Sequence, residues 1–432
     1  MLNLKSKSAL LALVLLPFTT IEAAWSTPVA ISSTVSDQPD IAVDLAGNAT
    51  AVWQGFDGSS YVIQSSSLPV SGSWSSPTTL SSSSEDAQGP EVAVDASGNA
   101  VTIWSRYDGS NSIVQGTTLP FSSSWTTPVD ISDAGQNADS VELAMDFSGT
   151  VGNAVAVWHR YNGANFIIQG STLPSGGSWT TPYSISVSGQ DALVPEVAVD
   201  PSGNAAVICS RFNGTNFTTR SATQLYGQTW SASVILSNPG QAASTQSIAL
   251  DASGNATASW DLYDGTNHMV QVSTKPFGSS WSSATTISTT GNDAYIPQVA
   301  VDPAGDALVI WVEYNGTNFI AQAATKPASG SWSSPVTISD SGVDVFDFSL
   351  KLDSAGNAVA VWDESDGVNS VIVAASLPSG GSWTTPVPIS TSGNYAYLPV
   401  VGVDSSGNAV AIWLESNGSN YVVTGATHLF GS

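Results

Sequence analysis

Four acidic side chains recur at one position in the first half of this chain. Asp40, Glu91, Glu142 and Glu196 each stand four residues before an aspartate of an internal repeat, at steps of 51, 51 and 54 residues. Two carboxyl groups that flank a bond can work together as acid and base, and such pairs cleave glycosidic bonds. The chain has 34 acidic residues, and spacing alone singles out no catalytic pair among them.

The repeat that carries these carboxylates is marked by tryptophans. A strand pattern ends in Trp after a D-x-x-G-N-A turn, as from Asp44 to Trp53, and only the fourth copy replaces this Trp, with Cys209. A second Trp opens a W-[ST]-x-P-x-x-[IL]-S pattern in every copy, from Trp25 to Trp383. All 15 tryptophans fall in these two positions. A constant period of this length is typical of propellers, solenoids or arrays.

Each period reads as four short strands between turn residues, without helical periodicity. In the second copy we predict strands over 91–95, 99–107, 112–118 and 125–132. Four antiparallel strands per repeat define a propeller blade. The chain begins with a lone fourth-type strand at Trp25 to Ser32 and ends after a third-type strand at Tyr421 to Thr427. The sequence therefore predicts an all-β, eight-bladed β-propeller whose N-terminal strand completes the last blade.

The domain organisation follows from the unbroken repeat. Residues 1–23 resemble a secretory signal peptide, with Lys5 and Lys7 before a short apolar stretch, and residues 24–432 form one predicted propeller domain. We expect a monomer that is secreted, periplasmic or at the cell surface and that does not insert into a membrane. The single cysteine cannot form an internal disulfide, so blade packing must supply the stability, and the blade with Cys209 is expected to be the weakest.

The turn between the third and fourth strands resembles a known family pattern. Sialidase-like propellers carry Asp boxes of the form [ST]-x-D-x-G-x-x-W, and Thr274, Pro276, Gly278 and Trp281 match that form with Pro in place of Asp. The repeats also resemble the tandem propeller repeats of exported bacterial proteins. Sialidase chemistry would imply an arginine triad, a Tyr nucleophile with a Glu partner, and an acidic proton donor. We predict that this chemistry is absent, because the ring separates the available arginines.

Those arginines have another predicted role. Arg106, Arg160 and Arg211 stand two residues after the second-strand Trp or Cys, in the repeats that carry Glu at the recurring acidic position. Neighbouring positions of a hairpin favour pairing. We therefore predict three structural ion pairs: Glu91 with Arg106, Glu142 with Arg160, and Glu196 with Arg211.

The last three blades carry the opposite charge at the arginine position. Glu313, Glu364 and Glu415 stand there without a basic partner in the repeat, which predicts an unpaired, solvated acidic arc. Clustered carboxylates suit Ca²⁺, although the repeat lacks the D-x-D-x-D spacing of dense calcium loops. No cofactor is otherwise expected.

An aromatic residue precedes the second turn of most blades. Aromatic faces beside Asp, Asn and Gly suit neutral sugars, whereas the alternative is a packing contact. The candidate binding residues of this kind are Tyr107, Tyr161, Phe212, Tyr263 and Tyr314.

The net charge of −25 excludes nucleic acid as a partner and favours neutral or cationic ligands. No catalytic set of Ser, His and Asp emerges, and near-identical blades argue against a single active site. We therefore expect a non-enzymatic propeller that binds a glycan or protein through its turn face. The alternatives are a glycoside hydrolase or lyase working near the central axis, where Asp40, Glu91, Glu142 and Glu196 gather, and a structural surface protein.

Overall fold

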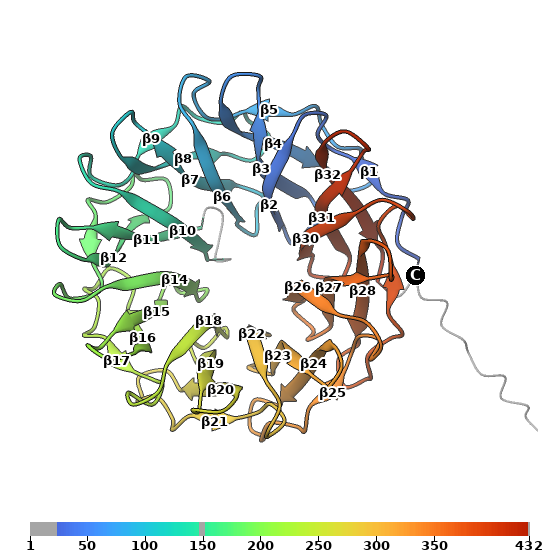
Figure 1. Ribbon diagram of the computed structural model, residues 1–432. Coiled ribbons are helices and arrows are strands. Elements are labelled where there is room, and N and C mark those ends of the chain that lie inside the picture. Colours follow the sequence, from blue (N-terminus) through green and yellow to red (C-terminus); the bar gives the residue numbers. More distant parts are fainter. Residues whose placement is uncertain (1–23, 147–151, 431–432) are drawn as a thin grey trace, which may run out of the picture.

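The computed structural model describes residues 24–146 and 152–430. In this part of the chain, 32 strands form eight four-stranded antiparallel sheets that are arranged as a ring around a central axis (Figure 1). The predicted eight-bladed propeller is confirmed. The signal-like segment 1–23 and most of the third-turn extension, Thr150 to Gly152, lie outside the described residues. The described residues include no helix long and apolar enough to cross a membrane.

The innermost strand of each blade faces the central axis (Figure 1). From blade one to blade eight these strands are β2 (Ser36–Val43), β6 (Ala87–Val94), β10 (Ala138–Met145), β14 (Ala192–Val199), β18 (Ala243–Leu250), β22 (Ala294–Val301), β26 (Val345–Leu352) and β30 (Ala396–Val403). The second strands are β3 (Ala49–Phe56), β7 (Ala100–Tyr107), β11 (Ala154–Tyr161), β15 (Ala205–Phe212), β19 (Ala256–Tyr263), β23 (Ala307–Tyr314), β27 (Ala358–Ser365) and β31 (Ala409–Ser416). We call the eight innermost strands the axis wall.

The outer half of each blade is a full third strand and a very short fourth strand. The third strands are β4 (Tyr61–Leu68), β8 (Ser112–Leu119), β12 (Phe166–Leu173), β16 (Phe217–Gln224), β20 (His268–Lys275), β24 (Phe319–Lys326), β28 (Ser370–Leu377) and β32 (Tyr421–His428). The fourth strands are β5 (Thr78–Thr79), β9 (Val129–Asp130), β13 (Tyr183–Ser184), β17 (Val234–Ile235), β21 (Thr285–Thr286), β25 (Val336–Thr337), β29 (Val387–Pro388) and β1 (Val29–Ala30). The fourth strand of blade two is shorter than predicted, and every other blade has a fourth strand of the same two-residue length.

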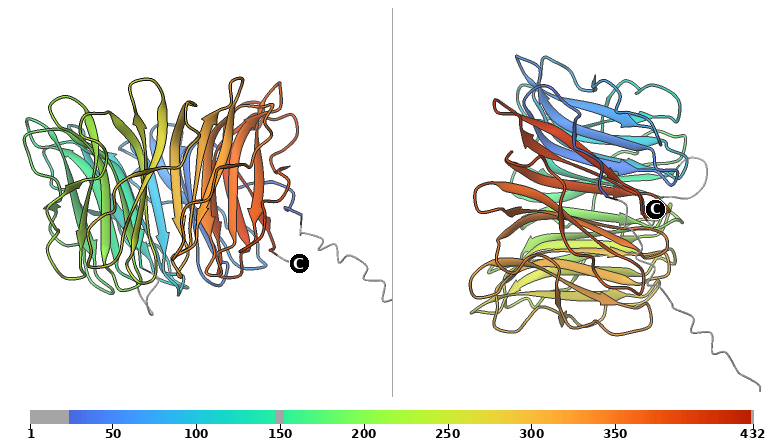
Figure 2. Two further views of the ribbon diagram at one scale, coloured as in Figure 1. Left: turned by 90° about the horizontal axis from the view of Figure 1, so that it is seen from below. Right: turned by 90° about the vertical axis from the view of Figure 1, so that its right-hand side faces the viewer.

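The ring closes between the two ends of the chain, as predicted. β1 pairs with β32 through Val29 opposite Gly425 and Ala30 opposite Thr424, so blade eight combines one N-terminal and three C-terminal strands. The side views of Figure 2 show the closed ring edge-on. Closure therefore gives every blade of the ring its four strands.

The turn after each innermost strand is held by its aspartate. In blade two, Asp95 is fully buried, and its Oδ1 accepts hydrogen bonds from the backbone N–H groups of Ser97 and Asn99, both at 2.9 Å. Gly98 has a φ of +82°, and a Cβ there would lie 2.8 Å from Asp44 of the preceding blade. The turn therefore requires glycine for two reasons: its positive φ, and its close approach to the turn aspartate of the preceding blade.

The core lies between blades, where each second-strand Trp is buried. Cys209, at this position in blade four, is 6% exposed, and burial raises the pKa of its thiol to about 12, so the thiol stays protonated and unreactive at neutral pH. Tyr183, where other blades carry Val or Thr, packs against the cluster that contains Cys209. A larger side chain from blade three thus takes up part of the volume that the missing indole leaves.

Candidate active site

The recurring acidic position is the fifth residue of an innermost strand. The structure places Asp40, Glu91, Glu142 and Glu196 on the axis wall of four consecutive blades, each partly exposed to water. The same position holds Ser247, Gln298, Ser349 and Val400 in blades five to eight. The axis wall is therefore acidic on one half and neutral at this level on the other half.

Several residues at this position join adjacent blades. An innermost strand is an edge, so its outer N–H groups lack a strand partner within the blade. The Asp40 carboxylate accepts the N–H of Val92 at 2.7 Å, and Gln298 Oε1 accepts that of Leu350 at 2.7 Å. Ser349 makes the equivalent contact with Val401 at 3.2 Å. These bonds connect several pairs of neighbouring blades and explain why a polar residue is favoured there.

Glu91 and Glu142 do not make this inter-blade bond in the described structure. Burial raises the pKa of both carboxyl groups well above the usual range, and neighbouring carboxylates raise it further. Protein surrounds the axis and removes much of the solvent that would stabilise the charged form, although some water still reaches these side chains. Both groups therefore hold their protons to higher pH than ordinary glutamates do, which suits them to donate a proton.

Asp40 and Glu196 have partners that favour their ionised forms. Burial raises the pKa of Asp40, but the Val92 N–H, Lys351, the Ile41 backbone and a hydrogen bond with Glu91 oppose that rise. Burial raises the pKa of Glu196 to about 7, against hydrogen bonds with Ser247 and the Ile248 backbone. Adjacent carboxyl groups with different pKa values are the usual basis of an acid and base pair.

Lys351 is the one basic residue on the eight innermost strands. Its place in the repeat is two residues after the acidic position, where the other seven blades carry Ala42, Ala93, Ala144, Ala198, Ala249, Ala300 and Gly402. Its side chain is exposed, and its positive charge acts on Asp40, Glu91, Glu142 and Glu196. A comparison of the copies at this position would have revealed it, because every other residue there is Ala or Gly.

The predicted Glu–Arg ion pairs are wrong. Glu91 lies opposite Ile103, and Arg106 stands three residues further along the same second strand, opposite Ala87. Three residues along a strand span about 10 Å, which is too far for a direct ion pair. Blades three and four have the same three-residue offset.

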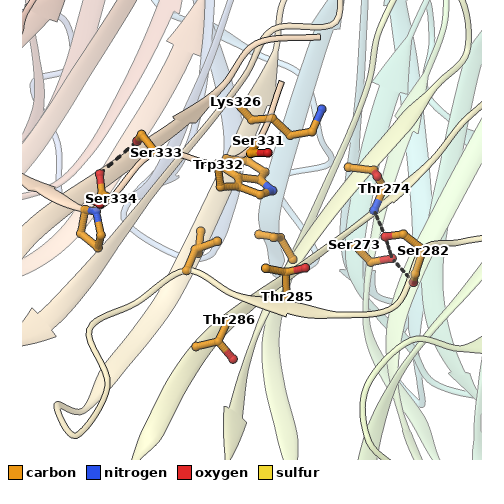
Figure 3. A pocket seen from close by; sticks show the side chains of 13 residues that line it. Ser273, Thr274, Ser282, Thr285, Thr286, Lys326, Ser331, Trp332, Ser333 and Ser334 are labelled. Atoms are coloured by element: carbon orange, nitrogen blue, oxygen red, sulfur yellow. Dashed lines mark hydrogen bonds between the residues drawn. The ribbon is translucent and has the colours of Figure 1, made fainter. Parts of the chain in front are cut away.

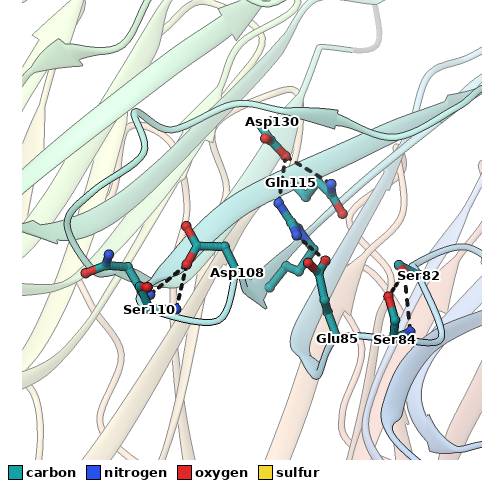
Figure 4. Close-up of polar contacts among 9 residues, drawn as sticks. Ser82, Ser84, Glu85, Asp108, Ser110, Gln115 and Asp130 are labelled. Atoms are coloured by element: carbon teal, nitrogen blue, oxygen red, sulfur yellow. Dashed lines mark hydrogen bonds and ion pairs between the residues drawn. The ribbon is translucent and has the colours of Figure 1, made fainter.

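The arginines bind other groups. Arg106 forms an ion pair with Glu85 from the loop before β6 and contacts Asp130 at 3.4 Å, and Gln115 also binds Asp130 (Figure 4). Arg160 is 3.8 Å from Asp133, and Arg211 donates to the Val187 carbonyl at 3.3 Å. Glu91, Glu142 and Glu196 therefore face the axis without an arginine.

The predicted solvated arc of Glu313, Glu364 and Glu415 is also wrong. Glu313 and Glu415 are 1% and 4% exposed, and each accepts the indole N–H of the Trp two residues earlier, at 2.9 and 2.8 Å. Asn292 and Asn394 donate to the same two carboxylates. Glu364 is partly buried, and burial raises its pKa while the Trp362 indole N–H lowers it. These glutamates satisfy buried donors between blades.

This role predicts a graded loss of stability. Glu415→Ala should lower the free energy of unfolding by about 2–3 kcal/mol, because it leaves buried N–H groups of Trp413 and Asn394 without an acceptor. Glu364→Ala, which removes one such bond, should cost about 1 kcal/mol. Denaturant unfolding of both variants measures the difference. Equal losses would contradict this assignment.

The predicted aromatic residues lie on one face of the ring, which we call the hairpin face because it carries the turns between second and third strands. Tyr107 is 49% exposed and lies opposite Ser112. The other four contact a ring across their own turn, with centroids 5.1–5.5 Å apart, as Tyr263 does with His268 at 5.1 Å. The structure therefore distributes these residues one per blade and does not bring them together. Their role in binding remains a proposal.

The hollows found on the outer rim lack acid and base groups. One groove of about 510 Å³ between blades five and six is lined by Trp332, Ser273 and other serines and threonines, with Lys326 as its only charged side chain (Figure 3). A similar groove of about 550 Å³ lies between blades four and five. Within the described residues, no group of three or more His, Cys, Asp or Glu is placed to hold a metal ion. The acidic half of the axis wall is thus the best candidate site.

Comparison with known proteins supports the fold. No family model matches this sequence, and no curated protein is significantly similar to it. Among solved structures, a family PL25 polysaccharide lyase, an ulvan lyase, superposes with a TM-score of 0.53 at 9% identity, covering 92% of this chain and 95% of that one. The NanB sialidase of Streptococcus pneumoniae gives 0.42 at 10% identity, covering 89% and 84%. A Penicillium chrysogenum α-L-arabinanase gives 0.42 at 12%, covering 94% and 99%.

The superposition on the ulvan lyase supports the propeller fold of this chain. The prediction of a non-enzymatic binding protein is contradicted, since this neighbour is an enzyme. The ground for that prediction was the similarity of the blades. The structure shows that the blades differ on the axis wall. Four of them carry a carboxyl group at its recurring acidic position, and one carries Lys351.

Proposed function

We propose that this protein is a glycoside hydrolase that acts at the acidic half of the axis wall. The observation that carries the proposal is the contact between Asp40 and Glu91 on adjacent blades, where different surroundings act on the two pKa values. Glu91 is the proposed proton donor, because no backbone N–H stabilises its charged form. Asp40 is the proposed base, because Val92 and Lys351 favour its ionised form.

In the proposed reaction, the substrate enters between the two carboxyl groups and replaces their mutual hydrogen bond, because the bond to be cleaved and the attacking water must lie between them. Glu91 then donates its proton to the glycosidic oxygen as the bond to the anomeric carbon breaks. A water molecule attacks that carbon and gives its proton to Asp40. The released sugar thus carries the proton from Glu91, and the pair returns to its starting state by moving the proton back through water. Lys351 supports this cycle by favouring the ionised Asp40.

The charge of the site favours neutral glycans as substrates. An anionic sugar would meet four carboxyl groups on the axis wall and a chain with a net charge of −25. A lyase acting on uronates must bind and neutralise the sugar carboxylate, for which this wall offers only Lys351. We therefore favour hydrolysis of neutral glycans over elimination.

Two further features fit this proposal. We infer export, because residues 1–23 have the pattern of a secretory signal and polysaccharides are met outside the cell. We assign the Asp-box-like turns, such as Thr274 to Trp281, a structural role like that of the turn they resemble.

A substrate screen tests the proposed activity. The purified protein is incubated with neutral and uronate-containing polysaccharides, and both new reducing ends and the ultraviolet absorbance of unsaturated products are measured. We expect reducing ends from at least one neutral polysaccharide without unsaturated products. Unsaturated products from a uronate polymer would instead indicate a lyase, and no cleavage of any polymer would refute the proposed activity.

A further inference from the structure

The rim of the axis wall has an aromatic segment opposite much of its acidic half. At the second residue of the innermost strand, blades six, seven and eight carry Tyr295, Phe346 and Tyr397. The same position holds Asp37, Gln88, Asp139, Leu193 and Ser244 in blades one to five. This position lies at the hairpin face, since the second residue of β22 pairs with Val312 near the end of β23. We call the three aromatic residues the aromatic lip.

We propose that the aromatic lip is a binding subsite that stacks against sugar rings of a neutral polysaccharide and guides the chain to the carboxyl groups of the axis wall. This inference deepens the proposed hydrolase function and rests on it for its link to catalysis. It concerns a different set of side chains, so binding can be tested without turnover.

Contacts extend the lip outward over the hairpin face. The Tyr295 ring lies 4.7 Å from His268 of blade five and 6.2 Å from Phe319, which is 38% exposed. In blade eight, Tyr397 lies 4.9 Å from Tyr421 and 5.8 Å from Tyr395. Phe346, between them, is 50% exposed. Tyr295 and Tyr397 are partly buried, whereas Phe319, Tyr395 and Tyr421 beside them are exposed. Together these rings offer apolar faces of the kind on which sugars stack.

Hydrogen-bonding groups flank these rings. Burial raises the pKa of Tyr295, and the negative charges of Asp293 and Asp261 raise it further. Burial likewise raises the pKa of Tyr397, and Asp37 of blade one is the first charged neighbour to add to that rise. A tyrosine hydroxyl or carboxylate beside an apolar ring matches a sugar, which has hydroxyls at its edge and C–H groups on its face. The same negative charges disfavour an anionic polymer.

The position of the lip gives it direction. The lip residues are the second residues of their innermost strands. The carboxyl groups are the fifth residues of the innermost strands of other blades. The lip occupies blades six to eight, and Asp40 and Glu91 occupy the next two blades around the closed ring (Figure 1). A polysaccharide that stacks on Tyr397 would therefore lie beside the blade that carries Asp40. This arrangement favours a chain of several sugars over a short glycoside.

Binding by an inactive chain tests the lip. The full-length Glu91→Gln protein is run in native gels that contain glucomannan, xyloglucan, arabinoxylan or arabinan, and retardation gives the affinity. Tyr295→Ala and Tyr397→Ala should each weaken binding to the retarding polysaccharide by about three- to tenfold. Tyr295→Phe and Tyr397→Phe keep the ring and should retain most of the affinity. Phe121→Ala, which removes an exposed ring from blade two, is the matched control and should have no effect.

The outcomes separate the two proposals. Absence of retardation in all four gels, unchanged binding by both lip alanine variants, or an equal loss in Phe121→Ala would overturn the lip. Retardation that depends on the lip, together with no cleavage by the wild-type protein, would support the lip and refute the hydrolase. Denaturant unfolding of Tyr295→Ala and Tyr397→Ala confirms that the tested variants are folded.

Discussion

Glu91→Gln is expected to lower kcat for glycoside hydrolysis by about 10²–10⁴-fold. The amide has nearly the shape of the carboxylic acid but cannot transfer its proton to the leaving oxygen. KM should change little, because the substitution leaves the Asp40 hydrogen bond to Val92 and the aromatic lip in place. The variant is assayed on the most active polysaccharide from the screen, with reducing ends as the measure.

The control variants are chosen by position and by bonding. Glu85→Gln removes a carboxylate that pairs with Arg106 away from the axis wall, and it should leave kcat within about twofold of wild type. Glu142→Gln removes the other axis-wall carboxyl group that lacks the inter-blade bond. If Glu142→Gln alone abolishes activity while Glu91→Gln retains it, the proton donor is Glu142 and the assignment of Glu91 is wrong.

The pH dependence of the rate follows from the same groups. Because the pKa of Glu91 is raised well above its usual range, the donor keeps its proton to higher pH than an ordinary glutamate does. Asp40, with the smaller rise, loses its proton first as pH increases. Activity should therefore increase as Asp40 ionises and fall again when Glu91 ionises at higher pH.

Stability should decrease as pH rises from about 4.5 to about 7, and Glu196 should be a major cause. The pKa of Glu196 is raised from 4.5 to about 7 in the native state, mainly by burial. Below about pH 4.5, the folded and unfolded chains both hold this proton. Between the two values only the folded chain still holds it, so each step up in pH favours the unfolded chain. The contribution is lost once pH exceeds about 7.

The full shift corresponds to about 3 kcal/mol, and water that reaches the axis wall reduces the expected effect to about 1–3 kcal/mol. Denaturant unfolding of wild type and Glu196→Gln at pH 4.5 and 8 measures this contribution. The variant should lose less stability across this range. Asp340→Asn removes one negative charge from the exposed surface and should keep the wild-type slope. An identical slope in wild type and Glu196→Gln would contradict the assignment.

The amino-acid sequence determined the architecture of this protein because the signals that specify a blade are local. Short strands alternate with Asp-x-x-Gly-Asn turns, each specified within about ten residues, and the Trp positions mark each copy. The lone strand at Trp25 also identified the closure, since a ring requires a partner for it. The same repeats placed Asp40, Glu91, Glu142 and Glu196 together near the axis. The sequence therefore showed that carboxyl groups gather near the axis, but it did not show that this position is the best candidate site.

Side-chain partners were decided only by the tertiary structure. The hairpin register places Glu91 opposite Ile103, three residues from Arg106, and Arg106 pairs instead with Glu85 from the loop before β6. Glu415 lies between blades and accepts the Trp413 indole N–H, which the repeat pattern does not show. Asp40 meets the Val92 N–H, 52 residues away along the chain, only when two blades pack together. Hydrogen bonding, burial and pKa depend on such contacts between distant segments, and so the site required the folded ring.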